Sequence, residues 1–315
     1  MSGKEPLMLK LGTNTGGIFR RLGVEEGFRQ IAASGFDSVD LDLSWLLPIR
    51  WPYTDPASKP RTVYEDMTDE ELYAVIRPYR EYAEKYGLSI GQAHAVDPPF
   101  INDPADDARL LQIIKKTIMI CGWLECPYLI IHPAHCEYYA EQITPEEEWE
   151  ANMKMYGECI PYLKKYNVTA CLENMFIQSE NKVYSSICQC PHEACRYIDT
   201  LNDMAGEKRF AFCLDTGHAL MVGMMLDRVI RILGHRLETL HINDNDGMWD
   251  KHMVPYTGIL EWEKFYEGLR TINYRGTLNF ELYWDFESEK LPTVMDEVAA
   301  IGRRMSKNVT GDEYH

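Results

Sequence analysis

Short apolar runs alternate with longer amphipathic stretches along the chain, with a period of roughly 35–40 residues, as expected when each strand is followed by a helix. The predicted strands are 8–13, 37–43, 89–95, 127–132, 168–173, 210–215, 237–242 and 276–282. Helical periodicity is found at 25–34, 68–86, 105–122, 145–166, 217–233 and 260–271, with a last helix near 290–305. This pattern predicts an α/β protein with a parallel sheet.

Eight predicted strands are the number that a closed barrel needs, so we expect a (β/α)₈ TIM barrel, a single domain over residues 1–315. The rival is an open, doubly wound sheet with a glycine-rich phosphate turn after its first strand. The turn that begins at Gly12, GTNTGGIF, does not fit G-x-G-x-x-G. The proline- and aromatic-rich segment 44–66 is expected to be an insertion loop at an active site or an interface.

Potential metal ligands directly follow the apolar runs. They are His94 in AHA, His132 in IIHPAH, Glu173 in CLEN, Asp215 in FCLDTGH, His241 in LHIND and Glu281 in NFEL. Because the strands of such a barrel all end on one face, we expect these side chains to lie close together. A lone glutamate at a strand end is most often a structural group, but four ligand residues at consecutive strand ends favour a functional site.

The last four strands contribute Glu173, Asp215, His241 and Glu281. Three carboxylates and one imidazole suit Mn²⁺, Mg²⁺ or Co²⁺ and can also bind Zn²⁺, so we expect one divalent metal ion, with Mn²⁺ preferred. Such an ion would acidify the carbon next to a sugar carbonyl. Two carboxylates on opposite sides of that carbon could then remove and return a proton.

Further polar residues are expected around this centre. His94, His132, His218, His252 and Trp45 are predicted to bind substrate, and His218, Asp250 and His252 are candidates for additional metal ligands. A histidine at a helix start, as His218 is, also commonly serves as a local hydrogen-bonding group. Aromatic residues in the 44–66 segment could equally pack beneath the insertion or across a dimer contact.

The composition of the chain limits the classes of molecule that it is expected to bind. The formal net charge of this 315-residue chain is −17, which disfavours nucleic acid and anionic membranes and suits a small neutral substrate. Nine scattered cysteines indicate a reducing compartment, and SICQCPHEAC favours a helix start with buried thiols over a zinc site. There is neither an apolar run of about 18 residues nor a signal-peptide core, so we expect a cytoplasmic protein without membrane contact.

The combined motifs AHA, HPAH, LEN, LDTGH, HIND, DKH and FEL resemble the xylose isomerase-like TIM-barrel superfamily from Leu11 to about Glu281. That superfamily joins sugar and sugar phosphate isomerases and epimerases, inosose dehydratases and apurinic endonucleases. For the epimerase branch the resemblance implies one metal on Glu173, Asp215, His241 and Glu281, with Glu173 and Glu281 as the proton-transfer pair. For the endonuclease branch it implies a three-zinc cluster that also includes His94, His132, His218, Asp250 and His252.

We therefore expect a metal-dependent isomerase or epimerase that acts on a small sugar or polyol, in a chain that could form a homo-oligomer. The alternatives are an inosose dehydratase-like lyase, a multi-zinc phosphodiesterase and a barrel without catalysis that serves as a binding protein. One departure from the family is Pro255-Tyr256-Thr257-Gly258, where P-G-x-G is usual.

Overall fold

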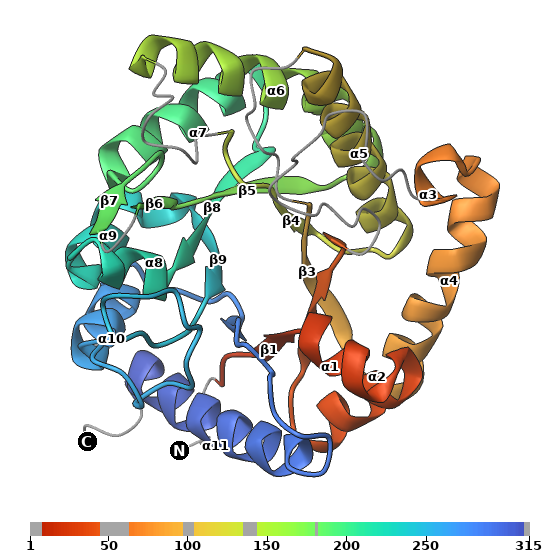
Figure 1. Ribbon diagram of the computed structural model, residues 1–315. Helices are drawn as coiled ribbons and strands as arrows, with labels where there is room; N and C mark the ends of the chain where they lie inside the picture. Colours follow the sequence, from red (N-terminus) through yellow and green to blue (C-terminus); the bar gives the residue numbers. More distant parts are fainter. Residues whose placement is uncertain (1–7, 45–62, 97–103, 135–143, 180–181, 312–315) are drawn as a thin grey trace, which may run out of the picture.

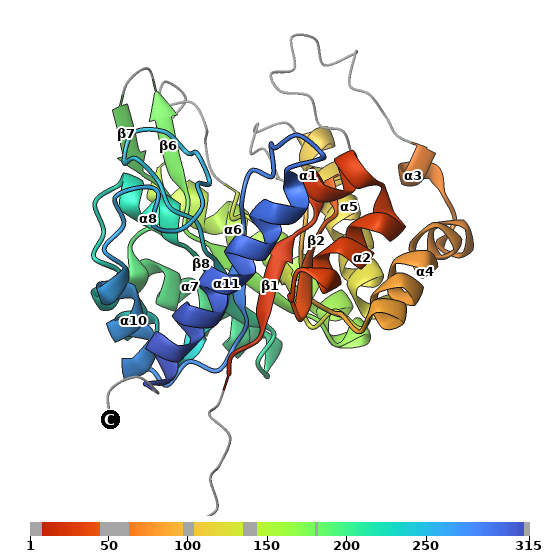
Figure 2. The same cartoon turned by 90° about the horizontal axis from the view of Figure 1, so that it is seen from below.

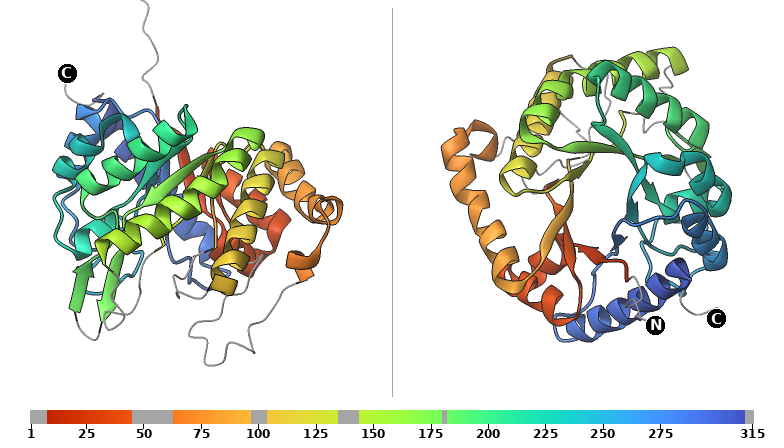
Figure 3. Two further views of the ribbon diagram at one scale, coloured as in Figure 1. Left: turned by 90° about the horizontal axis from the view of Figure 1, so that it is seen from above. Right: turned by 180° about the vertical axis from the view of Figure 1, so that it is seen from behind.

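The computed structural model describes residues 8–44, 63–96, 104–134, 144–179 and 182–311. Viewed along the barrel axis, the parallel strands form an inner ring that the helices surround (Figure 1). The same ring of helices is seen from the opposite end in the right panel of Figure 3. The predicted TIM barrel is confirmed.

All eight predicted barrel strands are present, most of them one to three residues shorter at an end than predicted. They are β1 (Leu11–Asn14), β2 (Ser38–Asp42), β3 (Ser89–His94), β4 (Tyr128–Ile130), β5 (Thr169–Glu173), β8 (Phe210–Asp215), β9 (Leu237–His241) and β10 (Leu278–Phe280). Their order around the sheet is β10-β1-β2-β3-β4-β5-β8-β9, with parallel neighbours. The barrel closes where Ile242 bridges Phe280 and its amide donates to Asn279 O at 2.8 Å.

The helices match the periodicity with two differences. They are α1 (Gly16–Leu22), α2 (Val24–Ala33), α3 (Val63–Asp66), α4 (Asp69–Tyr86), α5 (Pro104–Trp123), α6 (Pro145–Tyr166), α7 (Pro191–Ala205), α8 (Thr216–Met221), α9 (Leu226–Leu233), α10 (Trp262–Thr271) and α11 (Leu291–Thr310), with a 3₁₀ turn at Gly234–Arg236. The single helix predicted at 217–233 is wrong. It divides at Gly223, whose φ of 72° ends α8 and lets the chain turn before α9. The short helices α1 and α3 were not predicted, and α3 lies at the end of the segment 44–66 that was expected to be a loop.

A two-stranded antiparallel hairpin, β6 (Phe176–Ser179) and β7 (Lys182–Ser185), follows β5 and was not predicted. Figure 2 shows it projecting at the end of the barrel where the parallel strands terminate. Gln178 Nε2 donates to Met248 O at 3.2 Å and so ties the hairpin to the loop after β9. These two segments therefore form part of the rim above the barrel.

The main apolar core lies between the strands and the helices. Among its fully buried side chains are Tyr156, Tyr197, Phe210 and Trp284. Helix α7 begins directly after Cys190, as predicted, but that thiol is exposed and only Cys188 of the SICQCPHEAC cysteines is buried. The cysteines of the described residues are free. None of the helices within the described ranges is long and apolar enough to cross a membrane.

Candidate metal centre

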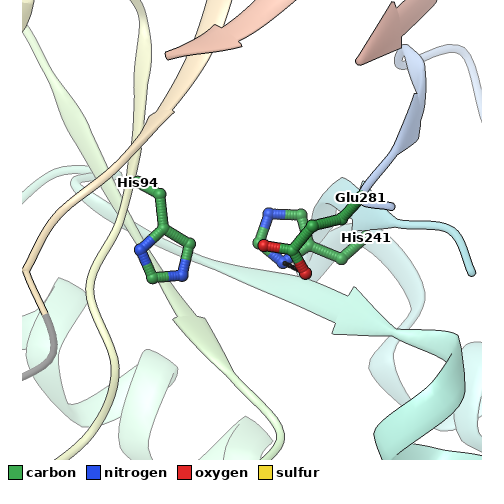
Figure 4. A group of neighbouring side chains, drawn as sticks. All are labelled: His94, His241 and Glu281. Atoms are coloured by element: carbon green, nitrogen blue, oxygen red, sulfur yellow. Dashed lines mark ion pairs between the residues drawn. The ribbon is translucent and has the colours of Figure 1, made fainter. Parts of the chain in front are cut away.

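Four side chains from consecutive strand ends converge above the barrel interior. Glu173, Asp215 and His241 end β5, β8 and β9, and Glu281 follows β10 directly. One potential ligand atom from each lies within 4.8 Å of those from the other three. His241 Nδ1 is 3.2 Å from both Glu173 Oε1 and Glu281 Oε2. Figure 4 shows the adjoining Glu281 and His241 side chains, with His94 facing them from the other side.

The backbone register brings these side chains together. Asp215 pairs with His241 across β8 and β9, and Glu173 pairs with Cys213 across β5 and β8. Asp215 is held at both oxygens, because Oδ1 accepts from His218 N at 2.7 Å and Oδ2 from Asn243 Nδ2 at 2.8 Å. The first of these bonds caps α8, so the helix start and the carboxylate orientation depend on each other.

In the described part of the chain, histidines are the ion-pair partners of Glu173 and Glu281. Burial would raise the pKa of Glu173, but the facing His241 and His132 hold it well below its ordinary value. Burial would lower the pKa of His241, yet Glu281 and Glu173 raise it well above the ordinary value. Burial raises the pKa of Glu281. One proton on His241 thus offsets part of the carboxylate charge, and a divalent cation among the same atoms would replace it.

His94, which ends β3, and His132, two residues after β4, line the opposite wall. Their Nε2 atoms are 3.0 Å apart, and His132 Nε2 is 3.2 Å from Glu173 Oε2. His94 Nδ1 lies 2.6 Å from Ala95 O, which fixes the ring orientation. Together with Glu173, these histidines form a second set of potential ligand atoms within 4.8 Å of one another.

A third group lies on the side of β8 and the loop after β9. His252 Nε2 is 3.0 Å from Asp250 Oδ2, and His218 Nε2 is 3.6 Å from the same oxygen. Asp215, His218 and His252 form another set of potential ligand atoms. His252 has a φ of 41°, which is uncommon for a residue with a Cβ. Burial would lower its pKa, but Glu281 and Asp250 raise it to about 9.

Every predicted site residue within the described part of the chain lies in one of these three groups or, like Asp250, contacts one. Trp45, in the predicted insertion loop, lies outside the described residues. At the altered P-G-x-G position, Tyr256 has a φ of 69°, a conformation that normally favours glycine. Its ring packs against Trp262, with centroids 5.2 Å apart, and its hydroxyl contacts that of Tyr266.

Two residues of this region were not recognised in the sequence. Asp40 of β2 lies 3.0 Å from His241 Nε2, deeper in the barrel than the four convergent ligands. Tyr283 stacks on His252 with ring centroids 4.5 Å apart. Tyr283 lies two residues after Glu281 in the segment that follows β10, and this spacing could have indicated from the sequence that it lies near the site.

The convergent residues fit a divalent cation. The side chains of Glu173, Asp215 and His241 are almost completely buried, and burying several carboxylates is costly without a compensating positive charge. Oxygen-rich sets with one imidazole suit hard and borderline divalent ions. Glu173, Asp215, His241 and Glu281 are therefore a candidate metal-binding cluster.

The chain belongs to the xylose isomerase-like TIM barrel family, whose model matches residues 28–303. It is 37% identical over 179 residues to an uncharacterized protein, y4fM, of Sinorhizobium fredii (strain NBRC 101917 / NGR234). That match covers 56% of this chain and 53% of the relative, so the chain spans about half the length of this curated protein.

Solved structures with the same fold include several enzymes named as sugar epimerases. A Methylomonas sp. D-allulose 3-epimerase in complex with D-allulose has a TM-score of 0.69 and 17% identity, covering 96% of this chain and 97% of that one. An E. coli 3-keto-D-glucoside 4-epimerase has a TM-score of 0.69 and 18% identity over 94% and 99% of the two chains. D-psicose 3-epimerase of Clostridium cellulolyticum H10 with D-tagatose has a TM-score of 0.67 and 15% identity over 96% and 99%. At these identities the likeness establishes the fold.

Proposed function

We propose that this protein is a metal-dependent isomerase or epimerase that moves a proton next to the carbonyl of a small ketose. The observation that carries the proposal is the convergence of Glu173, Asp215, His241 and Glu281 within 4.8 Å. Two of the four are glutamates that flank the same imidazole nitrogen. A site of this kind supplies both a cation cage and a pair of groups able to exchange protons.

The four residues would hold one divalent ion, with Mn²⁺ preferred and Zn²⁺, Co²⁺ or Mg²⁺ as alternatives. When bound, such an ion supplies positive charge that stabilises an enediolate. Glu173 and Glu281 supply the proton transfer: one carboxylate accepts the proton from the carbon next to the carbonyl, and the other returns a proton to the substrate. A single carbon changes configuration when removal and return occur on opposite faces.

The remaining polar groups position the substrate. His94 and His132 lie on one side of Glu173, and His218 and His252 lie on the side of Asp215. A protonated imidazole, which the raised pKa of His252 favours, donates from both ring nitrogens and so suits the hydroxyl and carbonyl oxygens of a sugar. The epimerase names of the fold neighbours support a carbohydrate substrate, and the net charge of −17 suits a substrate without a phosphate.

Isotope exchange tests this proposal. Protein loaded with Mn²⁺ in D₂O is incubated with a panel of unphosphorylated ketoses, and deuterium incorporation is located by NMR. We expect label at a carbon next to the carbonyl with wild-type protein and none with Glu173→Gln. Glu238→Gln is the matched control, because Glu238 lies at the other end of β9 and contacts Tyr128 and Lys208. Full exchange by Glu173→Gln would contradict the proposed role.

A hydrolase with several zinc ions is the second candidate. It is favoured by three of the five overlapping ligand sets, which together include every histidine predicted for a three-zinc cluster. It predicts about three Zn²⁺ per chain and nicking of duplex DNA at abasic sites, without deuterium exchange into ketoses. A lyase that uses the same centre would instead release water, so its product would be lighter than its substrate by one water molecule.

A further inference from the structure

Asp40 is a buried carboxylate inside the barrel. It lies within β2 and is only 1% exposed, almost as completely buried as its neighbours Val39 and Leu41. A carboxylate in this position is costly unless donors surround it. The strand that carries it contributes none of the four convergent ligands, so its place in the molecule needs a separate explanation.

Three donors from three other strands meet at one oxygen of this side chain. Asp40 Oδ2 is 2.9 Å from Gln92 Nε2, 3.0 Å from Asn279 Nδ2 and 3.0 Å from His241 Nε2. These partners come from β3, β10 and β9. These three donors hold the carboxylate in place. Its Oδ2 faces Nε2 of His241, whereas Nδ1 of the same ring faces Glu173 and Glu281.

The contact determines which nitrogen of His241 carries the proton. An ionised carboxylate only accepts hydrogen bonds, so the neutral imidazole places its N–H at Nε2. Nδ1 is then left with its lone pair, 3.2 Å from an oxygen of each flanking glutamate. A histidine that binds a metal through one nitrogen commonly donates the other N–H to a carboxylate, which orients the ring and makes the ligand more basic.

We propose that Asp40 is a positioning residue for the metal centre: it holds the proton on His241 Nε2 and directs Nδ1 toward the cation. This inference rests on the proposed metal centre described above. Asp40 does not touch the cation or the substrate in this account and acts through His241. A purely structural role, in which Asp40 only ties the strands together, makes a different prediction and is the alternative that the experiment separates.

The test compares three forms of the full-length protein by calorimetric titration with Mn²⁺. Asp40→Asn keeps the shape of the side chain but removes its charge. We expect it to raise the dissociation constant for Mn²⁺ by about 10–100-fold, the effect typical of losing such a partner. Gln92→Met is the matched control, because it removes a hydrogen bond to Asp40 and leaves the Asp40–His241 contact; its dissociation constant should stay close to the wild-type value.

A second measurement does not depend on any Asp40 variant folding. Two-bond ¹H–¹⁵N spectra of the ¹⁵N-histidine-labelled wild-type protein with Zn²⁺ report the proton position, and the His241 signal is identified by its loss in His241→Gln. We expect Nε2 protonated and Nδ1 bound to the metal. The opposite assignment overturns the inference, as does equal weakening of Mn²⁺ binding by Asp40→Asn and Gln92→Met, or unchanged binding by Asp40→Asn. If wild-type protein binds neither ion, the metal centre itself fails, together with this inference.

Discussion

The two walls of the site differ in how firmly their side chains are held. On the carboxylate side, Glu173, Asp215 and His241 are 1% exposed or less, and Asp215 and His241 have fixed partners at both polar ends. The fourth member, Glu281, is 16% exposed and is the most accessible of the four. On the histidine side, His94 and His132 are 17% and 12% exposed and face each other. The buried, preorganised ligands of the carboxylate side suit a cation, whereas the more accessible His94 and His132 suit a substrate that must enter and leave.

Removing a glutamate from the carboxylate side should have the largest effect. We expect Glu173→Gln to lower kcat by about 10²–10⁴-fold, because it removes both a proton-transfer group and a metal ligand. The measurement is steady-state turnover of the ketose found by deuterium exchange, at saturating Mn²⁺. Near-native kcat would place proton transfer elsewhere, and an unchanged circular dichroism spectrum excludes unfolding as the cause.

Changes on the histidine side should affect substrate binding more than metal binding. We expect His94→Asn to raise KM by roughly tenfold, equivalent to about 1.4 kcal/mol, the size of one lost hydrogen bond. Its Mn²⁺ content should equal that of the wild type. If Mn²⁺ is lost as well, His94 is a metal ligand, and the proposed hydrolase with several zinc ions is favoured.

Chelation should destabilise the protein, since the cation binds only the folded cage. At free metal about 100-fold above the dissociation constant, binding contributes about 2.7 kcal/mol, so we expect Tm to fall by about 5 °C on adding EDTA. Differential scanning calorimetry measures this. His94→Asn should respond like the wild type and Glu281→Gln much less; equal responses of both variants would remove the distinction between the walls.

Substitution of a carboxylate outside the metal-binding cluster should have the smallest effect, and it should stabilise the protein instead of impairing it. Burial, with the nearby Glu193, raises the pKa of Glu148 in α6 to about 7 from 4.5. The folded protein therefore binds a proton on Glu148 more tightly than the unfolded chain does. The contribution of this proton to the free energy of unfolding is complete below about pH 4.5 and is lost as the pH rises through 7. Because the side chain is partly exposed, Glu148→Gln should gain only about 1 kcal/mol at pH 8, by urea denaturation, and nothing near pH 4.5.

The carboxylate side was largely predictable from the sequence, because its members directly follow apolar runs and parallel strands end on one face of a barrel. Asp40 was not predictable in the same way. In SVDLD, the alternation of apolar and polar residues is equally typical of a strand with a solvent-facing side. Its partners Gln92, His241 and Asn279 lie 52, 201 and 239 residues away, so only the closed barrel identifies that face as interior.

The rim was also poorly predicted, for a local reason. The β6–β7 hairpin is short and its strand residues are half-buried or exposed, so it lacks the apolar run by which the barrel strands are recognised. Trp45 lies outside the described residues, so its predicted role in substrate binding stays a prediction. Strand ends are therefore easier to assign from sequence than the loops that decide which sugar enters.

The number of metal ions bound per chain is the decisive measurement for the cluster of Glu173, Asp215, His241 and Glu281. Wild-type protein and His241→Gln are equilibrated with Mn²⁺ and, separately, with Zn²⁺, freed of unbound ions by gel filtration and analysed by mass spectrometry of the metals. We expect one tightly bound ion per wild-type chain with either metal, and loss of that ion in His241→Gln. No bound ion in the wild type, or equal metal in both proteins, would contradict the cage formed by Glu173, Asp215, His241 and Glu281.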